Sequence, residues 1–172
     1  MRTTPILLVL TLFAGDVALA GAAPRPSWTH TRPLTPGAIR MLADATERSS
    51  IVRTLLQDLE QTDIVVYLTD SMAGTADEPA TYLGFLSRAA GTRYLLIRID
   101  RWRLPAGECI VWLGHELQHA IEIAAAPDVK DAAGLAKLYR HIGWEGQKGR
   151  FESAGAQTIG NRVRDQLAGY GH

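Results

Sequence analysis

Apolar positions spaced three or four residues apart, the spacing of an amphipathic helix, mark several regions of this chain. In the first region Thr35 precedes Pro36, which is typical of an N-cap followed by proline at the first helical position. Ser49 or Ser50 can cap a continuation as far as Glu60, so two helices or one bent helix are expected there. The predicted helices cover residues 36–48 with this continuation, 106–126, 129–142 and 151–167.

Three shorter stretches are typical of β-strands. Ile64–Thr69 is a largely apolar run rich in β-branched residues, and Thr81–Ser87 and Arg93–Trp102 follow it. Ala89–Thr92 is a plausible hairpin turn between the last two strands. Apolar and polar positions alternate in Arg93–Trp102, the half-buried pattern of a strand near a sheet edge. The order of elements predicts an α+β fold, with a small three-stranded sheet packed on helices.

Composition and charge narrow the class of protein. The 172 residues are 47% hydrophobic and 21% charged, which is ordinary for one globular domain. Eighteen basic residues balance eighteen acidic ones, so we expect no nucleic-acid partner, which would favour a basic face. Cys109 is the only cysteine, so no intrachain disulfide can form, and we expect it to be a buried, small apolar side chain.

The N-terminal residues are typical of a secretory signal peptide. Arg2 gives a positive start, residues 5–14 form an apolar run, and Ala18-Leu19-Ala20 is a small-x-small cleavage site. We expect a secreted or periplasmic protein, and no later run is long enough to cross a bilayer. Three parts are predicted: a signal peptide at 1–20, a proline-rich exposed arm at 21–35 and one domain at 36–172.

The motif His115-Glu116-Leu117-Gln118-His119 lies inside the predicted helix 106–126. Residues four apart share one face of a helix, so the imidazoles of His115 and His119 can bind one metal ion, and Zn²⁺ accepts nitrogen ligands readily. Glu116 lies about 100° round the helix from His115. It can flank the metal without binding it, which is the position of a general base for a metal-bound water.

A catalytic zinc usually has three protein ligands, so one more residue is needed. Glu152 heads an otherwise apolar stripe of the predicted helix 151–167, where an unpaired carboxylate would be costly. Gly155 and Gly160 in that helix allow close approach of another helix. Glu122 is the alternative because it shares the face of His115, although three ligands from one helix would crowd the metal. We expect Glu122 to hold a histidine N–H or an arginine instead.

These residues make the chain similar to the zincin metallopeptidases, and among them to the gluzincin pattern. In that pattern H-E-x-x-H supplies two ligands and the base, and a glutamate on a following helix supplies the third ligand. The resemblance implies zinc ligation by His115, His119 and Glu152, with Glu116 as the general base. It also implies that the strand before the motif helix, here Arg93–Arg101, borders the cleft and pairs with the substrate backbone.

Other zincin features are missing from the sequence. The metzincin pattern has a glycine and then a third histidine after the motif, where this chain has Glu122 and Ala125. That branch is therefore disfavoured. Position in the sequence alone offers three candidates for a residue that stabilises an oxyanion: Tyr139, His141 and Tyr170.

The expected function is that of a zinc-dependent hydrolase, a metallopeptidase with a peptide or protein substrate. Two alternatives stay open: a non-catalytic, zinc-stabilised domain that binds a partner at the cell envelope, and a chance motif in a metal-free helical core. Glu116 favours the enzyme, because a purely structural zinc site has no use for a base beside its ligands.

Overall fold

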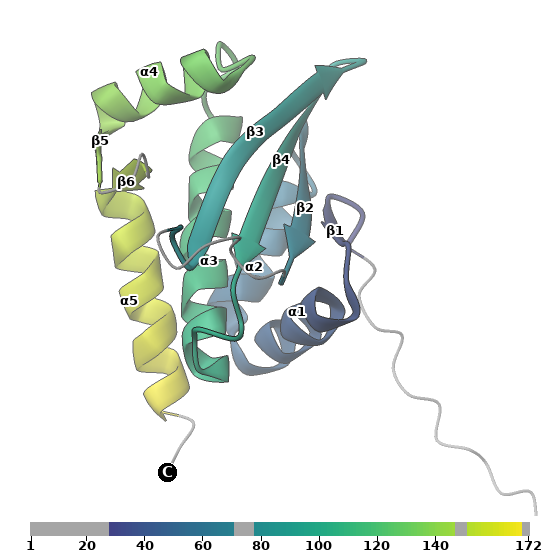
Figure 1. Ribbon diagram of the computed structural model, residues 1–172, viewed down its shortest axis with the longest axis vertical. Helices are drawn as coiled ribbons and strands as arrows, with labels where there is room; N and C mark the ends of the chain where they lie inside the picture. The colour runs from purple at the N-terminus through teal and green to yellow at the C-terminus, as the bar shows by residue number, and fades with distance from the viewer. Residues whose placement is uncertain (1–27, 71–77, 147–150, 170–172) are drawn as a thin grey trace, which may run out of the picture.

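Figure 1 shows the computed structural model, which describes residues 28–70, 78–146 and 151–169. These residues form a mixed α/β fold with five helices, a four-stranded sheet and a two-stranded sheet. The helices are α1 (Pro36–Arg48), α2 (Ser50–Leu59), α3 (Ala106–Ala124), α4 (Ala132–Ile142) and α5 (Ala154–Gly169). The strands are β1 (Thr31–Pro33), β2 (Ile64–Thr69), β3 (Thr81–Ala89), β4 (Thr92–Ile99), β5 (Gly143–Glu145) and β6 (Phe151–Ser153).

The larger sheet has the strand order β1-β2-β4-β3. β1, β2 and β4 are parallel, and β3 runs antiparallel to β4. The predicted hairpin turn is confirmed: Ala90 and Gly91 have φ values of 48° and 85°, the left-handed pair that a tight two-residue turn requires.

The prediction of a three-stranded sheet is wrong by one strand, because β1 lies inside the stretch expected to be an exposed arm. Thr31 is buried, and Thr31–Pro33 pairs with Val66–Leu68 of β2. Proline at the end of a short edge strand costs the ladder little, so Pro33 is compatible with this position. Three residues show no recognisable alternation, which is why the pattern did not reveal the strand. The predicted signal peptide lies outside the described residues.

The prediction that Arg93–Trp102 lies near a sheet edge is also wrong. β4 is hydrogen-bonded to β2 on one side and to β3 on the other, so the edge strands of this sheet are β1 and β3. The alternation in β4 has another cause. Leu95, Ile97 and Ile99 are buried, while the residues between them are half-buried on the other face of the sheet.

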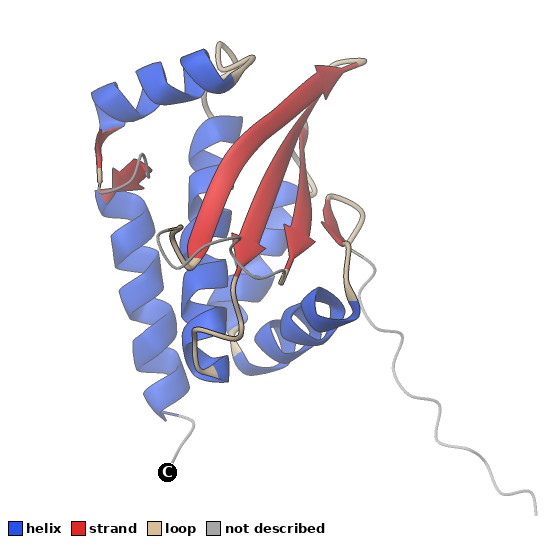
Figure 2. Ribbon diagram, viewed as in Figure 1, coloured by secondary structure: helices blue, strands red, loops and turns tan. Residues whose placement is uncertain are grey.

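Helix α3 packs against the sheet, and α2 packs against α3 (Figure 2). α1 and α2 are separate helices because Ser49 between them has an extended backbone, with φ −129° and ψ 114°. Its Oγ accepts a hydrogen bond from the Val52 N–H at 3.2 Å, so Ser49 is the N-cap of α2. Thr35 caps α1 as predicted, accepting from the Ala38 N–H at 3.1 Å.

Arg93 fixes the C-terminal end of α3 to the sheet. Its guanidinium is 2% exposed and donates to the carbonyls of Ile123 and Ala126, each at 2.8 Å. It also forms a bidentate pair with Asp63, at 2.8 and 2.7 Å. The last carbonyls of a helix have no partner inside the helix, and Arg93 supplies a donor in addition to the backbone N–H groups that follow the helix. Arg93 therefore ties this end of the motif helix to the sheet.

Beyond α4 the chain forms β5 and β6, where a loop and the start of a helix were expected. Trp144 pairs with Glu152, and α5 then runs alongside α3 (Figure 1). The two helices approach closely at Gly114, where a Cβ atom would lie 2.9 Å from Val163 Cγ2. Among the described residues, no helix combines the length and the apolar character needed to cross a membrane.

Candidate metal centre

The predicted motif helix is confirmed: α3 begins after Pro105 and carries His115, Glu116 and His119 near its middle. The two histidines are one turn apart, and their Nε2 atoms lie 3.1 Å from each other. Both side chains are buried, His115 at 5% and His119 at 2% exposure. Two imidazole nitrogens are thus directed at one point inside the protein.

Glu152 brings a carboxylate to the same point. Its Oε2 lies 3.6 Å from His115 Nε2, and one ligand atom from each of His115, His119 and Glu152 lies within 4.8 Å of the others. The sequence prediction therefore selected three residues that the fold places together.

The prediction that Glu152 lies on the last helix is wrong. Glu152 belongs to β6, and α5 begins at Ala154. The physical reason is Ser153, whose Oγ accepts a hydrogen bond from the Ala156 N–H at 3.0 Å in the manner of an N-cap. A serine in this role starts the helix after itself and leaves Glu152 free to pair with Trp144 of β5.

Two of the three ligand separations are close to those around a tetrahedral zinc ion. Tetrahedral zinc with bonds of about 2.0–2.1 Å places its ligand atoms about 3.3 Å apart. The observed separations of 3.1 Å between the histidine nitrogens and 3.6 Å from His115 Nε2 to the carboxylate lie on either side of this value. Two imidazoles and a carboxylate are also a common ligand set for catalytic zinc.

Glu122 lies behind His119, on the far side of its ring. Its Oε2 is 2.9 Å from His119 Nδ1, which places it at the nitrogen that does not face His115. Nδ1 therefore carries the proton and donates a hydrogen bond to the carboxylate, and Nε2 keeps a lone pair for a metal. Of the two candidates for a third ligand, Glu152 joins the cluster and Glu122 orients a histidine.

Two hydroxyl groups hold Glu122 in place. Ser153 Oγ donates to Glu122 Oε1 at 2.6 Å, and the Tyr139 hydroxyl donates to Oε2 at 3.2 Å. Burial raises the pKa of Glu122, but the hydrogen bonds from His119 and Ser153 outweigh burial and leave this pKa below its ordinary value. Burial and the neighbouring Glu122 carboxylate raise the pKa of Tyr139, so its hydroxyl stays protonated and remains a donor.

Glu116 borders a small cavity beside the ligands. The cavity has a volume of about 20 Å³, enough for one water molecule. It is lined by side chains of α3, α4, β3 and β6, among them Tyr82, Glu116, His119, Tyr139, Phe151 and Glu152. A carboxylate, two ligand residues and room for one water thus occur together.

Two glycines of α5 make room for the site. A Cβ atom at Gly155 would lie 2.6 Å from Glu122 Oε1, and one at Gly160 would lie 3.7 Å from both Cβ and Nδ1 of His115. The sequence prediction that these glycines permit close approach of a second helix is confirmed. Only Gly155 lies too close to its neighbour to accept a side chain without displacing it.

Other predicted site residues have different places. Tyr139 reaches the site, but its hydroxyl contacts the Nδ1 atom of His119, at 2.8 Å. It does not contact Nε2, the nitrogen that faces the other candidate ligands. His141 is exposed on α4, and Tyr170 lies outside the described residues. The segment Arg93–Arg101 was expected to pair with the substrate backbone. Its strand β4 lies between β2 and β3, so it has no free edge for that pairing. Cys109 is buried as predicted, and burial raises the pKa of its thiol.

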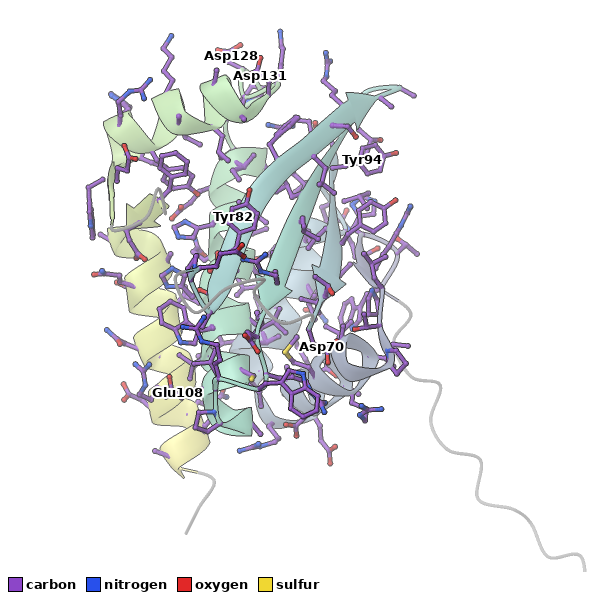
Figure 3. All side chains as sticks on the ribbon, viewed as in Figure 1. Asp70, Tyr82, Tyr94, Glu108, Asp128 and Asp131 are labelled. Carbon is purple, nitrogen blue, oxygen red and sulfur yellow. The ribbon has the colours of Figure 1, made fainter. Side chains whose placement is uncertain are left out.

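Sequence reasoning missed two residues of β3. Tyr82 (labelled in Figure 3) and Leu83 both line the cavity next to Glu116. Tyr82 is 40% exposed, so it lies between the cavity and solvent. Its involvement depends on β3 being the edge strand beside α3, which a local sequence pattern does not reveal.

Comparison of the chain with protein-family models, with curated proteins and with solved structures finds no match.

Proposed function

We propose that this protein is a zinc-dependent hydrolase of the zincin type, closest to the gluzincin arrangement, and that it cleaves peptide bonds. The observation that carries the proposal is the convergence of His115, His119 and Glu152, with their ligand atoms within 4.8 Å of one another. Glu116, on the same helix, lies beside a cavity with room for one water. Hydrolysis by a zinc enzyme needs three ligands, a base and a water. A purely structural zinc site has no use for the base or the water.

His115 and His119 would hold the ion through Nε2, and Glu152 through its carboxylate. A zinc ion held there would lower the pKa of a water to about 7 and polarise a carbonyl oxygen. Glu116 would accept a proton from that water and return it to the leaving amine. Glu122 keeps the His119 proton on Nδ1, so that Nε2 remains a ligand.

β3 takes the role that the resemblance assigns to a strand bordering the cleft. It is an edge strand, and Tyr82 and Leu83 near its N-terminal end line the cavity that Glu116 borders. An edge strand has unpaired backbone N–H and C=O groups, so an extended peptide can pair with it. This geometry supports a peptide or protein substrate. The signal-peptide pattern of residues 1–20 supports a secreted or periplasmic location.

The test combines zinc content with hydrolysis. The zinc-loaded full chain is incubated with a mixture of unstructured peptides, and products are identified by mass spectrometry. Glu116→Gln keeps the side-chain size and removes the base, so we expect zinc content to stay and cleavage to stop. Cleavage at the wild-type rate by Glu116→Gln would overturn the mechanism.

One observation favours a second candidate, a non-catalytic zinc-stabilised domain. The cavity beside Glu116 is only about 20 Å³, so a peptide carbonyl reaches it only if a lining side chain such as Tyr82 moves. In that case removing zinc lowers the melting temperature and no peptide is cleaved under any condition. The same two measurements therefore separate the two candidates.

A further inference from the structure

A second hollow, which we call the α3–α5 pocket, lies beside the candidate metal centre. It has a volume of about 230 Å³. α3 contributes Trp112 and His115 to its lining, β6 contributes Glu152, and α5 contributes Gly160, Asn161 and Arg164. Because His115 and Glu152 are also candidate metal ligands, any group that fills this pocket lies next to the metal. The pocket is far larger than the cavity beside Glu116 and can hold a whole side chain.

The positive charge of Arg164 is paired with a carboxylate. Arg164 donates from Nε and Nη2 to the two carboxylate oxygens of Glu108, each at 3.1 Å, and this pair joins α5 to the first turn of α3. Figure 3 labels Glu108 near the N-terminal end of α3. The pair therefore leaves no unpaired cation among the pocket's own side chains to attract an acidic group.

Asn161 offers the pocket a hydrogen-bond donor, and Gln157, whose amide can donate or accept, also lines the pocket. Arg164 Nη1 donates to Asn161 Oδ1 at 3.0 Å. A guanidinium has only donors, so the amide of Asn161 must turn its oxygen toward Arg164, and its NH₂ group remains to donate elsewhere. Trp112 adds an apolar wall, since its ring packs edge-on against His115 with a centroid separation of 5.0 Å. An uncharged side chain with an apolar stem and an oxygen acceptor complements these groups.

We propose that the α3–α5 pocket is a substrate subsite that selects a glutamine or asparagine side chain next to the scissile bond. The proposal rests on the proposed function, because it takes the reacting carbonyl to lie at the candidate metal centre. The aliphatic stem of the substrate side chain lies against Trp112, and its carboxamide oxygen accepts from Asn161 and from the remaining N–H groups of Arg164.

The experiment measures binding by calorimetry on the zinc-loaded full chain, with three short peptide hydroxamates as probes. They are identical except for one side chain, which is Gln, Glu or Met. The hydroxamate group binds zinc without any turnover. We expect the Gln probe to bind about five- to tenfold more tightly than the other two, which is the effect of roughly one net hydrogen bond.

Two variants locate the preference. Asn161→Leu keeps the side-chain shape and removes the NH₂ donor, so the advantage of the Gln probe over the Met probe should disappear. Arg162→Met changes an exposed residue of the same helix outside the pocket, and the advantage should remain. Equal affinity for the three probes, tightest binding of the Glu probe, or an advantage that survives Asn161→Leu would each overturn the proposal.

This design separates the subsite from the proposed function. A Gln preference in binding without any peptide cleavage would support carboxamide recognition by the pocket and count against the hydrolase. Peptide cleavage with equal affinity for the three probes would support the hydrolase and overturn the subsite.

Discussion

Glu122 Oε2 lies 2.9 Å from Nδ1 of His119, on the opposite side of the ring from the Nε2 atom that faces His115. The same carboxylate accepts a hydrogen bond from Ser153 Oγ, and Ser153 is the neighbour of Glu152 in β6. One carboxylate therefore orients a histidine on α3 and fixes the strand that carries Glu152. The two elements of the candidate metal centre are connected through it.

Removing this carboxylate should weaken zinc binding without abolishing it. Glu122→Ala takes away the acceptor at His119 Nδ1 and leaves all three candidate ligands in place. Loss of such a partner typically costs 10–100-fold in metal affinity. Titration against a chelating indicator measures the Kd, and Glu145→Ala, at an exposed position of β5, is the matched control. An unchanged Kd in Glu122→Ala would contradict the assigned role.

Gly155 and Gly160 form a matched pair on α5. A methyl group at Gly155 would lie 2.6 Å from Glu122 Oε1, whereas one at Gly160 would have ordinary contacts of 3.7 Å with His115. Glu122 is already held by His119 and Ser153, so it cannot move aside freely. We expect Gly155→Ala to lower zinc affinity. We expect Gly160→Ala to keep that affinity and to raise helix stability by up to about 1 kcal/mol. Equal zinc affinity in the two variants would be evidence against the packing described here.

Arg93 should be among the most important side chains for stability. Arg93→Met keeps an apolar stem but removes the charged donor of the Ile123 and Ala126 carbonyls, each of which keeps one backbone N–H donor. A hydrogen bond from a charged group is worth about 1.5–3 kcal/mol, so we expect a loss of about 3 kcal/mol in urea unfolding. Arg88→Met, at an exposed position of β3, should change the unfolding free energy by less than about 0.5 kcal/mol. A similarly small loss in Arg93→Met would show that other contacts hold α3.

The pair between Asp63 and Arg93 also predicts a pH dependence. Hydrogen bonds from Arg93 lower the pKa of Asp63 below its ordinary value of 3.8, against a smaller opposing effect of burial. A lowered pKa in the folded state means that the stabilisation is complete above the unfolded pKa and is lost as the pH falls through the folded one. The wild type should therefore exceed Asp63→Asn in urea midpoint at about pH 6, and the difference should shrink toward about pH 3. A difference that grows on acidification would refute this pairing.

Local sequence patterns predicted those elements of the fold that neighbouring residues determine by themselves. Ile64–Thr69 is β2, and the caps Thr35 and Ser49 set the starts of α1 and α2 as expected. β1 and the interior place of β4 were missed, since both depend on which strands pair across long distances in the sequence.

The candidate metal centre was predicted as far as its residues leave a local pattern in the sequence. His115 and His119 follow from a spacing within one helix. Glu152 was selected by its place before an apolar stripe, although it lies on a strand whose start and end depend on pairing with β5. Tyr82 comes from a distant strand and left no local signal.

The most direct measurement is the zinc content of the purified full chain, determined by mass spectrometry of the metal for the wild type, His119→Ala and Glu116→Gln. The account predicts one zinc ion per chain in the wild type and in Glu116→Gln, and a large loss in His119→Ala. A wild-type protein that stays free of zinc after reconstitution, while folded, would contradict the account at its centre.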